Sequence, residues 1–164
     1  MQGFTSYFAD QDTARHAVEL CLPMIDAAME SREAGASGFL YIVIMKPGFA
    51  PADGSFKEAI LYEHAVGDTA KWDADYGVFA RGKAEVSWRT GQDSLAVQQC
   101  KPYLLAEGDS LLCGGVVLHD IVVAVSGADP WFDEAFAGAV ILCLRALARK
   151  GLAEQGNKPW LGKA

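Results

Sequence analysis

The stretch LLCGGVVLHDIVVAVSGADPWFDE, Leu111 to Glu134, contains most of the features that decide the fold. Two apolar runs rich in β-forming residues, GGVVL and IVVAVSG, are joined only by His119 and Asp120. A link this short joins antiparallel strands, so the two runs predict a β-hairpin. Asp-Pro at residues 129–130 is typical of a helix start, with the aspartate as N-cap and the proline at the first helical position.

Strands are also predicted in the first half of the chain. Residues 38–45, GFLYIVIM, form a continuous apolar run, as expected of a central strand covered on both faces. Residues 58–66, EAILYEHAV, alternate like a second strand, and the intervening loop favours an antiparallel pair. Groups of strands with helices between them indicate an α+β domain with a mainly antiparallel sheet.

Helices are predicted at both ends of the chain. Apolar residues recur at helical spacing over residues 13–32, where Pro23 should kink or divide the helix. The last helix should run over residues 130–150, with Gly151 as its C-terminal cap. A short helix is expected before Pro102.

A further helix, predicted over residues 72–89, carries Lys83 on its apolar face, whereas Arg81 points away. An isolated buried charge costs too much free energy to persist. Lys83 should therefore pair with a carboxylate, bond to carbonyl groups, extend to solvent, or face a ligand. The predicted apolar stripe consists of Trp72, Tyr76, Phe79, Ala80 and Val86.

Length and composition limit the possible partners. We expect one domain over residues 1–164, with terminal arms at 1–11 and 152–164. The net charge of -7 disfavours nucleic acid and anionic membrane surfaces as partners. No leader or membrane-spanning pattern is visible, so a cytoplasmic location is expected, with four reduced core cysteines. These are Cys21, Cys100, Cys113 and Cys143.

Residues 111–134 do not match the common catalytic or phosphate-binding motifs. The acids Asp129, Asp133 and Glu134 place negative charge at a helix start, where a phosphate would otherwise bind. Ser126, His119 and Asp133 are the residue types of a catalytic triad, but Ser126 is outside a G-x-S-x-G elbow, so the sequence does not support a triad. We therefore interpret the stretch as a fold signature.

The three histidines do not match the spacing of a protein metal site, so no metal is predicted. A single histidine can still serve as an axial ligand to heme iron. His64 is the candidate, because it shares a strand face with Ile60 and Tyr62. A hydrogen-bonded, half-buried histidine is the alternative interpretation.

Two segments resemble a known family: VFARGKAEVSWRTG, residues 78–91, and GGVVLHDIVVAVSGADPWFDEAFAGAVI, residues 114–141. The family includes the glycolate-operon protein GlcG, the heme-binding protein HbpS and the carboxy-terminal domain of PduO-type corrinoid adenosyltransferases. The matching positions are Lys83-Ala84, Gly114-Gly115, Val125-Ser126-Gly127 and Asp133-Glu134.

The resemblance implies a profilin-like three-layer α/β/α fold with a five-stranded antiparallel sheet, assembled into homo-oligomers. It makes heme or a related tetrapyrrole the first ligand to test. In that arrangement Lys83 contacts a ligand carboxylate, His64 beside Tyr62 ligates iron, and the Gly114-Gly115 backbone permits close approach. The alternatives are an oligomeric accessory or scaffold subunit without a small ligand, and an enzyme acting on a small organic acid.

Overall fold

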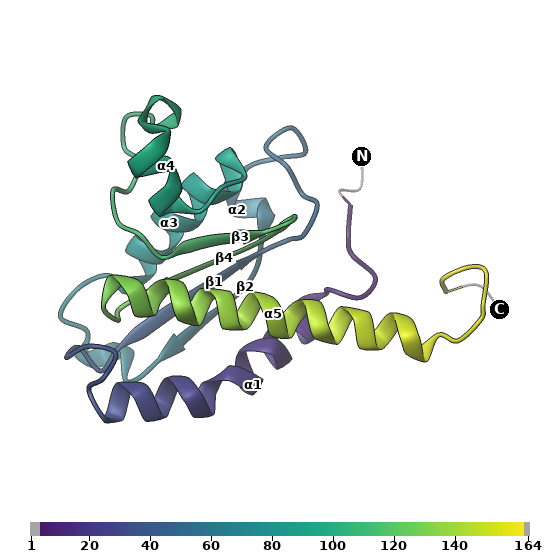
Figure 1. Ribbon diagram of the computed structural model, residues 1–164, viewed down its shortest axis with the longest axis horizontal. Helices are drawn as coiled ribbons and strands as arrows, with labels where there is room; N and C mark the ends of the chain where they lie inside the picture. Colours follow the sequence, from purple (N-terminus) through teal and green to yellow (C-terminus); the bar gives the residue numbers. More distant parts are fainter. Residues whose placement is uncertain (1–3, 163–164) are drawn as a thin grey trace.

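The computed structural model describes residues 4–162 of the chain. Helices and strands are interspersed along the sequence (Figure 1), which confirms the mixed α+β class. The elements are α1 (Gln11–Glu30), β1 (Leu40–Met45), α2 (Phe56–Ala59), β2 (Ile60–Val66), the 3-10 helix η1 (Thr69–Lys71), α3 (Tyr76–Thr90), α4 (Ser94–Cys100), the 3-10 helix η2 (Pro102–Leu104), β3 (Gly115–Leu118), β4 (Ile121–Ser126) and α5 (Pro130–Glu154). Over residues 4–162, no helix is long and apolar enough to span a membrane.

The strands form one antiparallel sheet in the order β2-β1-β4-β3. The predicted hairpin of β3 and β4 is confirmed, since Leu118 pairs with Ile121 across the His119-Asp120 turn. His119 has a positive φ of 53°, as tight hairpin turns require. The expectation of five strands is wrong for the part of the chain that the structure describes, which contains four.

Residues 105–114, directly before β3, lie against α3 and do not add a strand to the sheet. Arg89 of α3 binds the carboxylate of Asp109, which also accepts a hydrogen bond from the backbone N–H of Ala106. Ser110 packs so closely on α3 that its Cβ lies 3.2 Å from where a Cβ on Gly82 would be. These contacts hold the segment on the helix.

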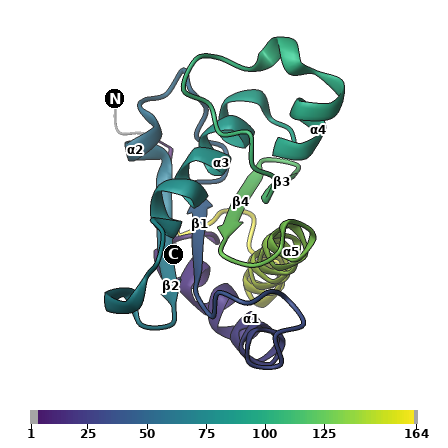
Figure 2. The same ribbon diagram turned by 90° about the vertical axis from the view of Figure 1, so that its left-hand side faces the viewer.

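Helices cover both faces of the sheet in three layers (Figure 2). On one face, α1 and α5 pack on Leu40, Ile42 and Ile44 of β1 and enclose the larger core. On the other face, α3 packs on Val43 and Met45 of β1 in a smaller core. β1 is therefore covered on both sides, as its unbroken apolar run predicts.

Two details of the long helices refine the predictions, which allowed Pro23 either to kink or to divide its helix. Pro23 does not divide α1, because Pro23 and Glu19 lie on its exposed side, where water can bond to the carbonyl that loses its helical donor. Gly151 is not a C-terminal cap, because α5 continues to Glu154 and includes residues 152–154 of the predicted arm. A Cβ on Gly151 would lie 2.9 Å from the ring of Phe8, so glycine gives space for the N-terminal segment.

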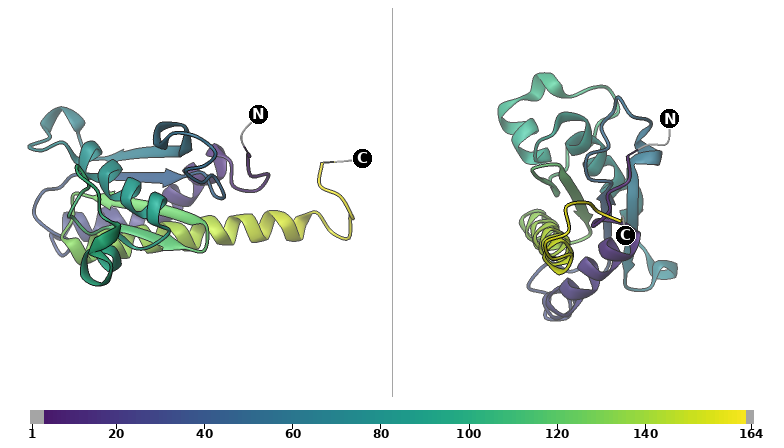
Figure 3. Two further views of the ribbon diagram at one scale, coloured as in Figure 1. Left: turned by 90° about the horizontal axis from the view of Figure 1, so that it is seen from above. Right: turned by 90° about the vertical axis from the view of Figure 1, so that its right-hand side faces the viewer.

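The end of α5 extends past the sheet, and residues 155–162 continue beyond the helix (Figure 3). Of the predicted arms, residues 1–3 and 163–164 lie outside the described residues. The N-terminal arm ends at Asp10, since Gln11 already belongs to α1.

The middle helices and strands also begin later than predicted. α3 starts at Tyr76, because Trp72 ends the preceding 3-10 helix, and Phe79 is 40% exposed. β2 starts after α2, whose first turn is closed by a capping box between Ser55 and Glu58.

Candidate functional site

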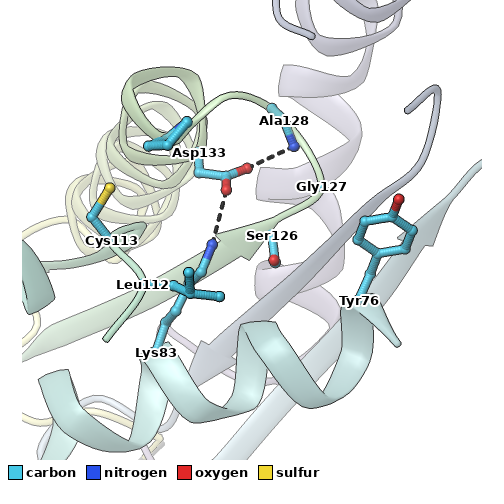
Figure 4. A pocket seen from close by; sticks show the side chains of 9 residues that line it. Tyr76, Lys83, Leu112, Cys113, Ser126, Gly127, Ala128 and Asp133 are labelled. Carbon is cyan, nitrogen blue, oxygen red and sulfur yellow. Dashed lines mark hydrogen bonds and ion pairs between the residues drawn. The ribbon is translucent and has the colours of Figure 1, made fainter. Parts of the chain in front are cut away.

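Lys83 and Asp133 form a buried ion pair between α3 and the start of α5 (Figure 4). Nζ of Lys83 lies 2.8 Å from Oδ2 of Asp133 and donates a second hydrogen bond to the carbonyl oxygen of Val125 at 2.9 Å. The two side chains are 3% and 4% exposed. Lys83 thus takes two of the options open to a buried lysine, a carboxylate partner and a backbone carbonyl.

Asp133 also holds the turn that leads into α5. Its Oδ1 accepts a hydrogen bond from the backbone N–H of Ala128 at 2.9 Å. α5 begins with Asp129 as N-cap and Pro130 in its first turn, as predicted, but within residues 4–162 the Asp129 side chain makes no capping hydrogen bond. Asp133 is therefore the acid that organises this helix start.

Burial controls the ionisation of this carboxyl group. Desolvation raises the pKa of Asp133 from 3.8 to about 6, against the opposing effects of the Lys83 ammonium and two backbone N–H groups. The group is ionised at neutral pH and becomes protonated in mild acid. Strongly shifted carboxyl groups in a cavity are more frequent at functional sites than elsewhere.

A cavity of about 200 Å³ opens beside the ion pair, and we call it the Lys83 pocket. Its walls come from α3, the segment before β3, the end of β4 and the start of α5 (Figure 4). The lining residues are Tyr76, Lys83, Leu112, Cys113, Ser126, Gly127, Ala128, Pro130 and Asp133.

Several polar groups border this cavity. The Lys83 ammonium has three N–H donors, of which the contacts to Asp133 and Val125 use two. Ser126 lies opposite Tyr41 in the sheet and therefore faces α3. Gly114 has a φ of +126°, and a Cβ there would lie 3.1 Å from Nζ of Lys83. The same Cβ would lie 2.6 Å from the carbonyl oxygen of Val125, so glycine at this position permits close packing of the backbone around the ion pair.

The Cys113 thiol that lines the pocket is not activated as a nucleophile. Burial raises the pKa of the Cys113 thiol, so this sulfur stays protonated at neutral pH. Burial likewise raises the pKa of Glu134, which lies close enough to Lys83 and Asp93 to feel their charges. The geometry is suited to binding a ligand through hydrogen bonds.

Tyr62 and His64, the other predicted ligand-binding residues, lie on the opposite face of the sheet. They pair with Ile44 and Ile42, which belong to the core under α1 and α5, and directly paired residues share a face. The Tyr62 hydroxyl lies 3.2 Å from Nδ1 of His64. The structure thus brings together Lys83, Gly114 and Gly115, and separately Tyr62 and His64.

Other combinations from the sequence remain apart. His119 is in the turn before β4 and Ser126 is the last residue of that strand, so Ser126, His119 and Asp133 do not form a catalytic triad. Within residues 4–162, no group of three or more His, Cys, Asp or Glu residues could hold a metal ion.

Sequence reasoning missed Tyr76, Leu112 and Cys113 as pocket residues. Tyr76 had been assigned to an apolar stripe, although its hydroxyl donates a hydrogen bond to Asp73 at 2.5 Å. Leu112 and Cys113 belong to a segment without regular structure, so no periodic signal pointed to them.

A solved structure supports the fold. The Klebsiella pneumoniae protein ORFY, described as a DUF336 family member, matches with a TM-score of 0.51 at 15% sequence identity, over 89% of this chain and 94% of that chain. No family model and no curated protein matches the sequence. At this identity, the likeness shows a shared fold alone.

Proposed function

We propose that this chain is a small-ligand-binding protein of the GlcG-like family and that the Lys83 pocket is its ligand site. The fold similarity to a DUF336 protein, a family that corresponds to the GlcG-like domain, supports the family assignment. The observation that carries the ligand site is the buried Lys83 ammonium, which lines a cavity and has one N–H donor beyond its two contacts within residues 4–162.

The charges around the pocket favour a neutral ligand. Among the described residues, Lys83 is the one positive side chain lining it, and Asp133 already compensates that charge at 2.8 Å. Glu134 adds a second negative side chain nearby. A ligand carboxylate, as the family resemblance implies, would compete with Asp133 for Lys83. A carbonyl, amide or hydroxyl oxygen can accept the remaining N–H without displacing it.

The size of the pocket sets the size of the ligand. The cavity of about 200 Å³ has the volume of about seven water molecules at about 30 Å³ each. Pockets that enclose drug-sized molecules measure about 300–1,000 Å³. The ligand class is therefore a small neutral organic molecule with an oxygen acceptor and some apolar surface to meet Leu112 and Pro130.

Two neighbouring leucines provide a matched test. Leu112 lines the pocket, whereas Leu111 is 69% exposed and outside the lining. Thermal shift measurements with small amides, ketones and alcohols, each beside its matching carboxylate, should show stabilisation by neutral members. Leu112→Trp should abolish the effect, and Leu111→Trp should retain it. Equal binding in both variants would refute the site, while preference for carboxylates would refute only the ligand class.

Native mass spectrometry of the chain purified from cells complements this screen. A co-purified small molecule should be present with the unaltered chain and with Leu111→Trp, and lost with Leu112→Trp. Its mass identifies the ligand directly. A molecule retained equally by both variants would place the ligand site elsewhere.

Heme remains the second candidate, and His64 is the observation that favours it. Desolvation lowers the pKa of His64, so the imidazole is neutral at neutral pH, the form that ligates iron. However, His64 and Lys83 are on opposite faces of the sheet, and the Lys83 pocket is too small for a tetrapyrrole. The described residues therefore do not fit one heme site that uses both.

Hemin titration tests this candidate, with His16→Ala on the exposed side of α1 as the matched control. We expect that any change in the Soret band is the same in the unaltered chain and in His64→Ala. A band shift that is lost in His64→Ala and retained in His16→Ala would place heme at β2 and contradict the assignment to the Lys83 pocket.

Homo-oligomer formation through the end of α5 would be compatible with either ligand. Leu152, Trp160 and Leu161 are 56%, 68% and 47% exposed, on the part of the chain that projects past the sheet (Figure 3). Light scattering on the chain truncated after Gly156 tests whether this part mediates assembly. If the truncated chain forms an assembly with the same number of subunits, tail-mediated assembly is excluded.

A further inference from the structure

Cys21 of α1 and Cys143 of α5 meet where these two helices pack together over the larger core. Their sulfur atoms lie 3.6 Å apart, although the residues are 122 positions apart in sequence. Cys21 is 4% exposed and Cys143 is half-buried, and both are free thiols. Neither lines the Lys83 pocket, so the ligand site does not account for their proximity.

We propose that Cys21 and Cys143 are a redox-active thiol pair, which a low-molecular-weight disulfide such as oxidised glutathione converts into an intramolecular disulfide between α1 and α5. In the first step, the Cys143 thiolate attacks the small disulfide, forms a mixed disulfide and releases one small thiolate. In the second step, Cys21 loses its proton and attacks Sγ of Cys143, which releases the second small thiolate. Two protein thiols are oxidised, and one small disulfide is reduced to two thiols.

The surroundings of the two sulfurs decide the order of these steps. Cys143 is the more accessible to a reagent from solvent. Burial raises the pKa of Cys21 to about 12, and the contact with Cys143 makes a smaller contribution in the same direction. Cys21 is therefore a poor first nucleophile. Once Cys143 carries the mixed disulfide, Cys21 is already beside it. The sulfurs must still approach by about 1.5 Å to reach disulfide bonding distance.

The crosslink should stabilise the fold, because it closes a long loop and so restricts the unfolded chain. The test is to incubate the native chain with oxidised glutathione, alkylate the remaining free thiols, digest without reduction and map the peptides. We expect a peptide that joins Cys21 to Cys143, together with a rise in melting temperature that dithiothreitol reverses.

Cys100 supplies the matched control, because it is exposed, contrary to the prediction of a core cysteine. Cys100→Ala should retain the crosslink and the reversible rise in melting temperature, whereas Cys143→Ala should lose both. The peptide map of the unaltered chain decides the pairing even if a variant folds poorly. Alkylated Cys21 and Cys143 after oxidation, a mixed disulfide that never resolves, or a crosslink through Cys100 or Cys113 would each overturn the proposal.

Discussion

Gly115 lies where β3 passes close to α3, and we predict that Gly115→Ala destabilises the fold. An added Cβ would lie 2.5 Å from Oγ of Ser87 and 2.7 Å from the backbone oxygen of Lys83. Ordinary van der Waals contact begins at 3.4 Å, so these distances are 0.9 Å and 0.7 Å too short. The serine hydroxyl can rotate, but the carbonyl belongs to α3, so the helix itself must shift.

Overpacking of this kind costs about 1–3 kcal/mol, and occasionally more. For a chain of this size, each kcal/mol lowers the melting temperature by about 2–4 °C, so we expect a decrease of about 2–12 °C. Because the shifted helix carries Lys83, ligand binding at the pocket should weaken as well.

Gly138 in α5 provides the matched control, because within residues 4–162 no atom beyond its chain neighbours and the backbone of α5 lies within 4 Å of a Cβ added there. Alanine is the better helix former by about 0.5–1 kcal/mol, so Gly138→Ala should stabilise the fold. Urea unfolding, followed by the fluorescence of the four tryptophans at one protein concentration, compares the two variants. Equal stability of Gly115→Ala and Gly138→Ala would refute the close approach of β3 and α3.

The Ser87 hydroxyl permits a second check, because it is buried and has no hydrogen-bond partner within residues 4–162. Ser87→Ala alone should therefore cost little. In that background Gly115→Ala should be partly rescued, since one of its two short contacts disappears. Complete rescue would contradict the contact with the Lys83 carbonyl oxygen.

Three further predictions concern the ion pairs. Because the pKa of Asp133 is higher in the folded state (about 6) than its ordinary 3.8, its contribution to the free energy of unfolding should grow by up to about 3 kcal/mol as the pH falls from about 6 to about 4. A pH series of urea unfolding should show this slope in the wild type and not in Asp133→Asn; parallel profiles would contradict it. Replacing the pair by Lys83→Met and Asp133→Asn together should change stability by less than about 3 kcal/mol, since desolvation offsets much of the attraction. The same double variant should lose the ligand detected by native mass spectrometry, and retention would exclude Lys83 from binding. Asp109→Ala should speed hydrogen exchange over residues 104–110, because Arg89 loses the carboxylate that holds this turn; unchanged protection there would show that the turn does not depend on the pair.

Local patterns in the sequence were sufficient for the hairpin and for the start of α5. A two-residue link between apolar runs and an Asp-Pro pair each act within a few neighbouring residues, so the predicted β3–β4 turn and the N-cap at Asp129 are confirmed. The ion-pair partner of Lys83 could not be predicted from such local patterns. The helical stripe showed that the ammonium needed compensation, but Asp133 is 50 positions away and meets it only after α3 and α5 have packed.

The position of His64 shows a second limit of sequence patterns. Alternation along β2 correctly placed Tyr62 and His64 on one face, where the Tyr62 hydroxyl lies 3.2 Å from Nδ1 of His64. A period of two separates the faces of a strand but does not say which helix covers each face, because the connections between elements decide that. The pairing with Ile42 puts His64 under α1, while Lys83 approaches from α3 on the other side. A ligand that contacts both residues would have to extend across the sheet or around its β2 edge. Under the proposed assignment to the Lys83 pocket, the charge and volume of that pocket favour a small neutral molecule.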